Sequence, residues 1–369
     1  MKSTFNNVGV VGVGAMGQGI AQMSAQAGAQ VFLFDMQAPA VEKAVQAIQL
    51  QWQKMLEKGR ISSDTCSAYT GRLRACDSLA QLSACDLVIE AIVENLAVKK
   101  ELFAQLEALV PVATVLATNT SSLSVTAIAA QLKQPQRFAG YHFFNPVPLM
   151  KVVEVVAGLK TSDTVCEQLD AFTRQMGHTP VRTRDTPGFI VNHAGRGYGT
   201  EALRIVGESV SDFATIDRIL KDQVGFKLGP FELMDLTALD VSHPVMESIY
   251  HQYYEEPRFR PSIITAQRLA AGVLGRKTQE GFYSYVDGKA QMPPELPPPV
   301  VEDMPPVWVS PRAARRPELL QLLTDALYEM LRRRGTGCDA DMLDTVEPNQ
   351  LDFISMLDQT RRYAVVGCD

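Results

Sequence analysis

The sequence predicts a doubly wound α/β sheet, followed by an all-helical segment and a small proline-linked tail. Short β-branched and apolar runs alternate with helical patterns over the first half of the chain, which is typical of a parallel sheet covered by helices. A glycine-rich loop stands between the first strand and the first helix, as doubly wound sheets often have. The alternation stops at Thr186-Pro187-Gly188, where we place a domain boundary.

The first strands and helices lie on either side of the glycine loop. Residues 8–13 (VGVVGV) form a short β-branched run that predicts a buried strand, and residues 15–28 predict a helix of small residues. A second strand is expected over 30–35 (QVFLFD). From 39 to 58 the apolar residues are mostly three or four apart, so this stretch is predicted to be an amphipathic helix.

More strands extend the predicted sheet. Four further strand candidates, which we expect to be separated by helices, lie at 86–91, 114–118, 138–142 and 151–156. A helix over 163–176 and a strand over 180–184 come before the boundary. From there to about residue 273 the pattern is helical only.

The last part of the chain has a different composition. Residues 287–306 contain seven prolines, which predict a stiff linker. After it we expect a strand over 307–310, a helix over 317–334 and a final strand in the sequence AVVGCD. Because that last strand has no obvious partner, the tail over 287–369 is predicted to be a small or incomplete accessory domain.

Composition and charge exclude several classes of protein. The chain has 369 residues, of which 46% are hydrophobic and 21% charged, which is typical of a globular protein with more than one domain. Its 35 basic and 41 acidic residues give a net charge of −6, so we expect no nucleic-acid partner. No apolar run reaches the roughly 18 residues of a membrane span, so we expect no membrane partner.

The N-terminus and the cysteines indicate the compartment. The first residues run directly into an apolar strand and resemble neither a signal peptide nor a transit peptide. The six cysteines form no CxxC pair and stand at no metal-ligand spacing to a histidine. We therefore predict reduced thiols, no metal site and a cytoplasmic location.

The glycine loop has the pattern of a dinucleotide-binding, or Rossmann, motif. Residues 12–17 (GVGAMG) match GxGxxG, with a strand before them and a helix after them. The first glycine permits a tight turn, the second lets the backbone approach a pyrophosphate, and the third lets helix and strand pack closely. The helix N-terminus adds free N–H groups and a positive dipole end. The cofactor-binding residues expected here are Gly12, Gly14, Ala15, Met16 and Gly17.

Asp35 predicts which dinucleotide is bound. It ends the second strand, 18 residues after Gly17, where such folds place an acidic residue on the adenosine ribose. A carboxylate there accepts hydrogen bonds from the ribose hydroxyls and repels a 2′-phosphate. Met36 and Gln37 supply no arginine to reverse this preference. We therefore expect the cofactor to be NAD rather than NADP.

A histidine and a glutamate form the candidate catalytic pair. Of the five histidines, His142 closes a predicted strand at the carboxyl edge of the sheet, where ligands of open α/β folds bind. Glu154 stands twelve residues later inside the apolar run VVEVV, where a buried carboxylate needs a partner. One interpretation is that Glu154 orients His142 as a general base. The other is a packed core histidine and a glutamate at the sheet rim, and the pattern alone leaves both open.

Several long motifs resemble those of one enzyme family. They occur in the order GVGAMGQGIAQ, LVIEAIVENLAVKKELF, ATNTSSLSV, RFAGYHFFNPVPLMKVVEVV, DTPGFIVN, LGPFELMDLTALDV and GRKTQEGFYSY. Together they are similar to the L-3-hydroxyacyl-CoA dehydrogenase family, which includes the 3-hydroxybutyryl-CoA enzymes. The similarity runs from about residue 5 to residue 286, and motifs of this length in register are far more specific than a glycine loop alone.

The resemblance implies the NAD-dependent, reversible oxidation of an L-3-hydroxyacyl-CoA to the 3-oxoacyl-CoA. His142 matches the family's general base, and Glu154 matches its orienting carboxylate. Ser121 matches the serine that binds the substrate oxygen, with Ser122 as the alternative if the register slips by one. Asn192 matches the active-site asparagine from the second domain. The remaining cofactor-binding assignments are Ala91, Glu94, Lys99, Asn119 and Asn145.

Coenzyme A adds a requirement for cations beside its phosphates. Lys54, Lys58 and Arg60, at the end of the second predicted helix, are the candidates for substrate binding, and a solvated charged face is the alternative interpretation. The family usually has arginine where this chain has His193, directly after Asn192. This departure puts the family's local hydrogen bonding at that position in question.

The resemblance also implies the domain organisation. We expect an NAD-binding domain over 1–186, a helical domain over 187–286 that closes the active site and dimerises, and the tail over 287–369, which resembles the linker region of longer bacterial members. Apolar positions in the helical domain exceed what one thin layer can bury, which favours a homodimer. These positions are Ile190, Val191, Leu203, Ile205, Val206, Ile216, Ile219 and Leu220.

Two other functions share some of these features. An L-gulonate 3-dehydrogenase has the same fold and catalytic pair, and assays on acetoacetyl-CoA and L-gulonate would distinguish the two enzymes. A non-catalytic NAD-binding structural protein is the other alternative. Such a protein has no need to keep His142, Glu154, Ser121 and Asn192 together, so the intact set favours an enzyme.

Overall fold

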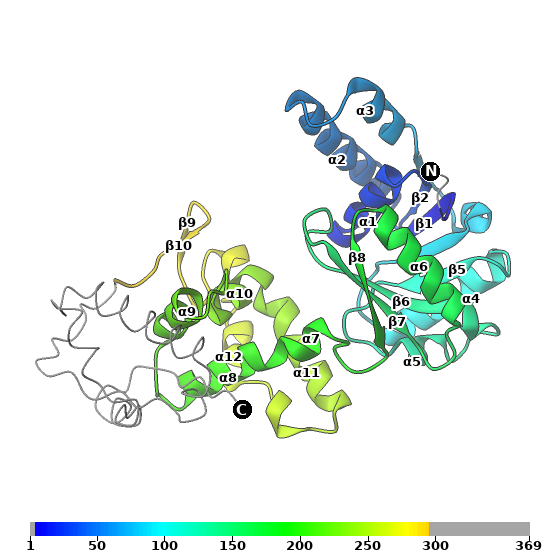
Figure 1. Cartoon of the computed structure of the whole chain (residues 1–369). Helices are drawn as coiled ribbons and strands as arrows, with labels where there is room; N and C mark the ends of the chain where they lie inside the picture. The colour runs from blue at the N-terminus through cyan, green and yellow to red at the C-terminus, as the bar shows by residue number, and fades with distance from the viewer. Residues whose placement is uncertain (1–3, 295–369) are drawn as a thin grey trace, which may run out of the picture. The chain divides into compact units, whose positions relative to one another are not determined.

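The computed structural model describes residues 4–294, and the fold below refers to these residues. Residues up to Met292 form one compact unit (Figure 1). The second unit, Pro293–Asp369, lies almost entirely outside the described residues. The strand expected at 307–310, the helix expected at 317–334 and the expected C-terminal strand therefore lie outside them as well.

An eight-stranded sheet forms the first part of this unit, with the strand order β3-β2-β1-β4-β5-β6-β7-β8. The strands are β1 (Asn7–Val11), β2 (Gln30–Phe34), β3 (Leu73–Ala75), β4 (Leu87–Glu90), β5 (Val115–Thr118), β6 (Phe138–Phe143), β7 (Val152–Ala157) and β8 (Thr179–Arg184). All neighbours pair in parallel except β6 and β7, which pair antiparallel. The strand order reverses between β1 and β4, and the carboxyl ends of strands at such a switch point are where open α/β sheets bind ligands.

Helices cover both faces of the sheet, which confirms the predicted fold class (Figure 1). They are α1 (Ala15–Gln26), α2 (Ala38–Glu57), α3 (Ser63–Thr70), α4 (Leu96–Leu109), α5 (Val125–Ala129) and α6 (Asp163–Gln175), with short 3-10 helices η1 (Leu79–Ala84) and η2 (Pro135–Arg137). One core includes Ile20, Trp52 and Phe172 from α1, α2 and α6. A second core includes Phe103 and Ile128 from α4 and α5. The sheet is therefore buried between two helical layers.

The connection between β6 and β7 differs from the prediction. A helix was expected between these two strands, but residues 144–151 form no helix. The Pro146 carbonyl oxygen accepts the N–H groups of Leu149 at 2.9 Å and Met150 at 3.0 Å, which closes a turn. Prolines at 146 and 148 oppose a helix, and strands that are joined by a short turn run antiparallel. The expectation of a helix here was wrong.

Two further elements were not predicted. They are α3 and β3, which have eight and three residues. Hydrophobic periodicity needs a longer window than either provides, so both are invisible to it. The local signal for α3 is Ser62, the N-cap residue, whose side chain accepts the Thr65 N–H.

The helical segment follows β8. Its helices are α7 (Val191–Ala194), α8 (Arg196–Gly207), α9 (Phe213–Asp222), α10 (Pro230–Thr237), α11 (Leu239–Gln252) and α12 (Ile263–Ala270), with short 3-10 helices η3 (Pro257–Phe259) and η4 (Arg276–Thr278). They pack around a core that includes Leu203, Phe231 and Leu239. No strand interrupts them between α7 and α12, as the sequence predicts. Within residues 4–294, no helix combines the length and apolarity needed to cross a membrane.

Residues 287–290, at the start of the predicted proline-rich linker, are part of a hairpin. Instead of a linker from residue 287, the chain forms a hairpin of β9 (Tyr285–Val286) and β10 (Lys289–Ala290). Asp287 and Gly288 between these strands have positive φ angles of 49° and 74°. Positive φ at both central residues is typical of an Asp-Gly hairpin turn. The Asp-Gly pair is the signal that could have predicted the hairpin.

Candidate active site

Two positions of the glycine loop accommodate only glycine. Gly12 has a φ of 92°, and a Cβ atom there would lie 2.5 Å from the Ala91 carbonyl oxygen. A Cβ atom on Gly17 would lie 1.8 Å from the Gly12 carbonyl oxygen. Beside Gly14, in contrast, no described atom beyond its chain neighbours lies within 4 Å of such a Cβ. The loop is therefore packed tightly at its two ends and open in the middle, where a ligand can approach.

The first turn of α1 presents backbone N–H groups. Gly14 is the N-cap residue and has no side chain that could accept them. Ala15 and Met16 begin the helix, and its first turn contains no acidic residue. The positive end of the helix dipole is therefore not neutralised by a side chain of this turn, which suits the binding of a phosphate group.

Asp35 follows β2 and lies beside this loop. Its carboxylate accepts the backbone N–H groups of Val13 at 3.1 Å and of Gln37 at 3.0 Å. These bonds hold the side chain at the carboxyl end of β2. The next residue, Met36, is 94% exposed. Asp35 therefore lies where a ribose-binding carboxylate is expected in this fold.

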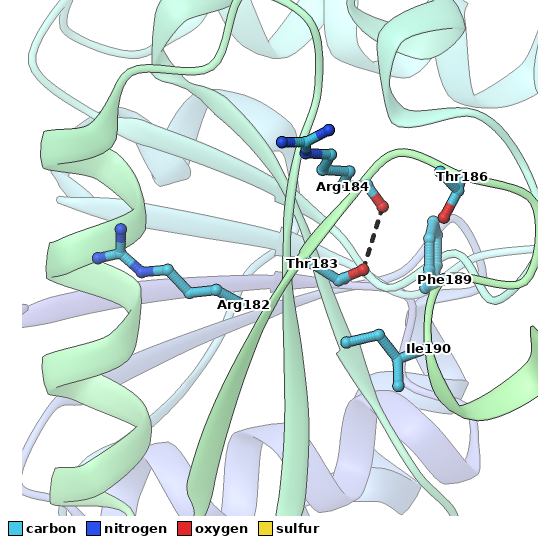
Figure 2. A pocket seen from close by; sticks show the side chains of 6 residues that line it. All are labelled: Arg182, Thr183, Arg184, Thr186, Phe189 and Ile190. Carbon is cyan, nitrogen blue, oxygen red and sulfur yellow. Dashed lines mark hydrogen bonds between the residues drawn. The ribbon is translucent and has the colours of Figure 1, made fainter. Parts of the chain in front are cut away.

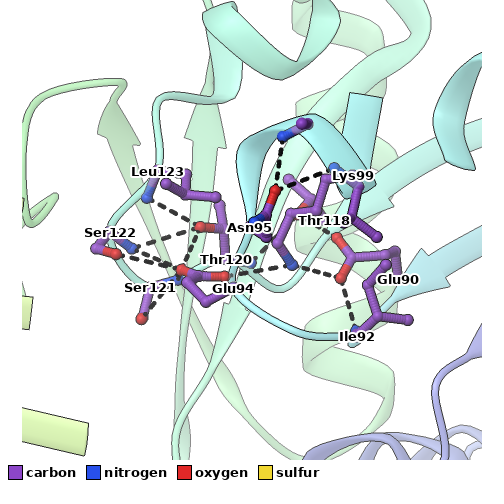
Figure 3. Close-up of polar contacts among 12 residues, drawn as sticks. Glu90, Ile92, Glu94, Asn95, Lys99, Thr118, Thr120, Ser121, Ser122 and Leu123 are labelled. Carbon is purple, nitrogen blue, oxygen red and sulfur yellow. Dashed lines mark hydrogen bonds and ion pairs between the residues drawn. The ribbon is translucent and has the colours of Figure 1, made fainter. Parts of the chain in front are cut away.

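A buried ion pair lies behind the end of β4 (Figure 3). Glu90 is fully buried, and Lys99 on α4 is 1% exposed. One Glu90 oxygen contacts Lys99 Nζ and accepts the Ile92 N–H at 2.7 Å. The other accepts the Thr118 hydroxyl at 2.6 Å. Both oxygens are thus hydrogen-bonded, which is the condition under which a charge can be buried.

Glu94 links this ion pair to the turn that carries Ser121 (Figure 3). Its Oε2 lies 3.2 Å from Lys99 Nζ. Its Oε1 accepts the Thr120 hydroxyl at 2.6 Å and the N–H groups of Ser121 at 2.8 Å and Ser122 at 3.2 Å. Burial alone would raise the pKa of Glu94, but Lys99 and these hydrogen bonds hold that pKa below its usual range. Glu94 therefore stays ionised and holds the turn.

His142 and Glu154 are direct neighbours across β6 and β7. The antiparallel register places them opposite each other, so both side chains lie on the same face of the sheet. His142 Nδ1 lies 2.7 Å from Glu154 Oε2, and both residues are buried. The rings of Phe144 and Phe189 pack against the imidazole, with centroid distances of 4.4 and 5.8 Å. The structure brings the two predicted residues into contact.

The second oxygen of Glu154 binds the start of the helical segment. Its Oε1 accepts the N–H groups of Ile190 and Val191, each at 2.9 Å. Burial raises the pKa of Glu154, but the His142 ring and these N–H groups outweigh burial and hold that pKa below its usual value. Beside an ionised carboxylate, Nδ1 carries the proton of a neutral imidazole, and Nε2 is left to accept another. The pair has the geometry of an oriented general base.

The helical segment also reaches the turn that carries Ser121. Asn192 on α7 donates from Nδ2 to the Ser121 carbonyl oxygen at 3.1 Å. The neighbouring His193 has its Nδ1 3.0 Å from the Tyr253 hydroxyl. Ser121 is half-buried, whereas Ser122 is only 4% exposed, so Ser121 is the better placed of the two to meet a ligand.

The other predicted site residues lie in different surroundings. Asn119 follows β5, and its side-chain oxygen accepts the Phe143 N–H at 2.9 Å. Ala91 donates its N–H to the Val11 carbonyl oxygen at 2.8 Å, and Asn145 is exposed after β6. The exposed basic residues at and after the end of α2 are Lys54, Lys58 and Arg60. These three cations lie at or after the end of α2, whereas His142 and Glu154 lie on β6 and β7.

A cavity of about 460 Å³ that is widely open to solvent lies at the edge of the sheet beside β8 (Figure 2). Phe189 and Ile190 line it, and Phe189 is the residue whose ring packs against His142. Arg182 also lines it, but its guanidinium forms an ion pair with Asp170 on α6 at 2.7 Å. The cavity therefore borders the His142–Glu154 pair and does not include it.

Two residues near the turn of Ser121 and the ion pair behind it were not identified from the sequence. Glu90 ends the apolar strand LVIE, and a carboxylate within an apolar strand is the same signal that identified Glu154. Gln252, the last residue of α11, donates from Nε2 to the Ser122 carbonyl oxygen at 2.7 Å. No sequence pattern marks Gln252, because its contact arises only when the helical segment meets the sheet.

Several known proteins with similar sequences or structures are named as dehydrogenases of CoA thioesters. The chain is 45% identical over 285 residues to 3-hydroxyadipyl-CoA dehydrogenase from Escherichia coli K12. This match covers 77% of this chain and 60% of that protein. The crystal structure of 3-hydroxybutyryl-CoA dehydrogenase from Escherichia coli K12 matches with a TM-score of 0.77 and 43% identity, over 81% of this chain and 63% of that one. The (S)-3-hydroxybutyryl-CoA dehydrogenase from Ralstonia eutropha matches with a TM-score of 0.74 and 36% identity, over 77% of this chain and 100% of that one.

The chain thus spans about 60% of the length of the first of these relatives. Two family models match it in succession. The NAD binding domain of 3-hydroxyacyl-CoA dehydrogenase matches residues 7–186, and the C-terminal domain of 3-hydroxyacyl-CoA dehydrogenase matches residues 188–285. These matches cover the sheet, the helical segment and the residues that join them, so the chain belongs to the 3-hydroxyacyl-CoA dehydrogenase family.

Proposed function

We propose that this protein catalyses the NAD-dependent, reversible oxidation of an L-3-hydroxyacyl-CoA to the 3-oxoacyl-CoA. The observation that carries the proposal is the cluster in which His142 pairs with Glu154 while Asn192 contacts Ser121. Family membership supports the same activity. Similar proteins are named for 3-hydroxyadipyl-CoA and 3-hydroxybutyryl-CoA, which supports a CoA thioester as the substrate.

In this proposal His142 takes the proton of the substrate's C3 hydroxyl at Nε2. Glu154 holds the Nδ1–H, fixes the tautomer and stabilises the imidazolium that forms. Ser121 and Asn192 bind the substrate oxygens whose charge changes during the reaction. In the reverse direction the imidazolium returns its proton to the oxygen of the 3-oxo group.

The residues around the glycine loop fit NAD. The open backbone at Gly14 and the uncapped start of α1 suit a pyrophosphate, and the carboxylate of Asp35 suits a ribose diol. Bound NAD would supply the acceptor for the hydride of the substrate's C3. The other residues that we propose for the cofactor site are Ala91, Glu94, Lys99, Asn119 and Asn145.

The activity is tested by following NADH absorbance with two substrates. We expect NADH oxidation that depends on acetoacetyl-CoA. The same preparation is assayed with L-gulonate and NAD as the control for a sugar-acid dehydrogenase. NADH formation from L-gulonate without turnover of acetoacetyl-CoA would contradict the proposal.

Cofactor preference is expected to depend on Asp35. The double substitution Asp35→Ala and Met36→Arg removes a charge that repels a 2′-phosphate and adds a cation at an exposed position. We expect it to shift the ratio of kcat/KM for NADH over NADPH toward NADPH by about 10²-fold. Because Asp35 also accepts two backbone N–H groups, one on each carboxylate oxygen, Met36→Arg alone, which keeps both bonds, is the control with an undamaged loop. A wild-type enzyme that uses both cofactors equally well would contradict the ribose argument.

Three other assignments complete the proposal. Lys54 and Lys58 are proposed to contact the phosphates of CoA, because both are exposed cations. The boundary between the two catalytic domains is proposed to lie between residues 186 and 187, in the chain between β8 and α7. The protein is proposed to act in the cytoplasm.

A homodimer is proposed on the apolar surface of the helical segment. Of the apolar positions expected to favour a dimer, Leu203 and Ile216 are buried within the segment itself and so do not support a partner. Ile190, Val191 and Ile205 are 36–41% exposed. A different group is exposed between α9 and the end of α10. It consists of Val224, Phe226, Leu228, Leu233 and Leu236, which are 37–53% exposed. Large apolar side chains grouped in this way are typical of a protein–protein interface.

The dimer is tested by light scattering coupled to size-exclusion chromatography. We expect a mass of about twice the 40.5 kDa of the chain at micromolar concentration. Phe226→Glu, which places a charge in the exposed group, should shift the mass toward the monomer, whereas Val112→Glu on an exposed loop of the first domain should not. A monomeric wild type would contradict the proposal.

A further inference from the structure

Side chains from outside the turn bind every backbone polar group of Ser121 and Ser122. The two N–H groups donate to Glu94 Oε1 at 2.8 and 3.2 Å (Figure 3). The Ser121 carbonyl oxygen accepts Asn192 Nδ2 at 3.1 Å, and the Ser122 carbonyl oxygen accepts Gln252 Nε2 at 2.7 Å. The shortest of these four bonds comes from Gln252, which neither the sequence motifs nor the proposed mechanism uses.

The side chains that make these four bonds come from two parts of the fold. Glu94 belongs to the sheet side of the site, between β4 and α4, and holds the N–H groups. Asn192 on α7 and Gln252 at the end of α11 belong to the helical segment and hold the carbonyl groups. The position of Ser121 therefore depends on the helical segment as well as on the sheet.

Contacts within the helical segment also hold the side-chain amide of Gln252. Its Nε2 also lies 2.9 Å from Ser248 Oγ and 3.2 Å from the Ser248 carbonyl oxygen, one helical turn earlier. The next residue, Tyr253, stacks on Phe259 with a centroid distance of 4.6 Å and bonds to His193 on α7. These contacts keep the end of α11 beside α7, so the two amides face consecutive carbonyl groups.

We propose that Gln252 is a positioning residue that fixes the turn of Ser121 and Ser122 for catalysis. This inference rests on the proposed function, in which Ser121 binds the substrate oxygen. Without the Gln252 bond, the Ser122 carbonyl group loses its partner and the turn is held on its carbonyl side by Asn192 alone. A small displacement of Ser121 then weakens a contact that matters most in the transition state.

Gln252→Glu tests this inference through its dependence on pH. An ionised carboxylate cannot donate to the Ser122 carbonyl oxygen and repels it, whereas a protonated carboxyl group donates as the amide does. With acetoacetyl-CoA and NADH, we expect kcat/KM to be about tenfold below wild type near pH 7.5. The ratio of variant to wild type should rise between pH 7.5 and pH 5, because the Ser122 carbonyl oxygen disfavours the ionised form of the new carboxyl group and so raises its pKa above the usual value of about 4.3.

The neighbouring titratable groups do not imitate this recovery. Glu94 faces the turn from the sheet side, and Asn192 faces it from α7 without a charge. His193, His251 and Tyr253 lie on the elements that carry the two amides, and they are present in both proteins. Taking the ratio of variant to wild type at each pH therefore isolates the carboxyl group at 252.

Two other variants complete the test. Ser248→Ala removes the Ser248 hydroxyl that Gln252 contacts but keeps the bond to Ser122, so its kcat/KM should stay within about twofold of wild type. Gln252→Ala removes the donor at every pH, so its activity should not recover at low pH. NADH affinity, measured by fluorescence, should stay within about twofold in all variants and report an intact fold.

Each outcome separates the two proposals. A Gln252→Glu variant as active as wild type at both pH values, or a loss that is the same at both, would overturn the positioning role. If the wild type itself failed to oxidise NADH with acetoacetyl-CoA, both this inference and the proposed function would be overturned.

Discussion

Replacing His142 by glutamine is expected to lower kcat by about 10²–10⁴, the usual contribution of a positioned general base. Glutamine can keep a hydrogen bond to Glu154, but it cannot take a proton from the substrate near neutral pH. None of the contacts of the glycine loop or of Asp35 involves His142, so NADH affinity should change by less than about twofold. Steady-state kinetics with acetoacetyl-CoA and fluorescence titration with NADH measure the two quantities separately.

Glu154→Gln should also lower kcat strongly, for a reason that the hydrogen bonds make specific. The glutamine oxygen can still accept the N–H groups of Ile190 and Val191, so the start of α7 keeps its anchor. The glutamine NH₂ group then faces His142 Nδ1 and requires it to be an acceptor. That places the imidazole proton on Nε2, the nitrogen that should receive the substrate proton.

The double variant His142→Gln with Glu154→Gln should be little worse than the worse single variant, because the two side chains act as one unit. Strictly additive losses would show that the roles are independent. His251→Gln, on the exposed end of α11, is the matched control and should keep kcat within about twofold. A His142→Gln enzyme with near-normal turnover would rule out the general-base mechanism.

The part of the site that could be predicted from sequence follows from strand patterns. Apolar runs in the sequence predict buried strands, and a charged residue within such a run needs a partner. That reasoning gave a pair of Glu154 with His142 as one of two interpretations, and the register places the two residues directly opposite each other. The reasoning did not foresee that the pairing is antiparallel, because a helix was expected between the two strands. The turn at Pro146 removes that helix and makes the two residues cross-strand neighbours.

The other contacts of the site could not be predicted, because they join residues that are far apart in the sequence. The turn of Ser121 and Ser122 is held by residues that are 27 or more positions away in the sequence, on elements that meet only in the folded unit. Short elements are a second reason, because three residues of β3 are too few to show a period. Family resemblance named Ser121 and Asn192, but the direct contact between them comes from the structure.

Breaking the buried ion pair behind the site is expected to have the largest effect on stability. Lys99→Met leaves the fully buried Glu90 carboxylate without a cation, although Ile92 and Thr118 still donate to it. Loss of one partner of a buried pair typically lowers the free energy of unfolding by about 3–5 kcal/mol. Urea unfolding followed by circular dichroism measures this change.

Glu90→Gln should cost less, about 1–2 kcal/mol, because its partner is not left alone. Lys99 keeps its second carboxylate, Glu94, at 3.2 Å. The asymmetry between the two single variants is therefore the specific prediction, since a simple pair of charges would give similar losses in both. A Glu90→Gln variant at least as destabilised as Lys99→Met would contradict this arrangement of charges.

The double variant Glu90→Gln with Lys99→Met should be more stable than Lys99→Met alone, because it buries no unpaired carboxylate at position 90. Lys277→Met is the matched control, since Lys277 forms an ion pair with Asp240 but its side chain is 59% exposed. Exposed pairs contribute about 1 kcal/mol or less, so this control should unfold close to wild type. Lys99→Met should therefore lower the free energy of unfolding more than Lys277→Met, because the Glu90–Lys99 pair is buried. Equal decreases in the two variants would show that burial of the pair does not matter for stability.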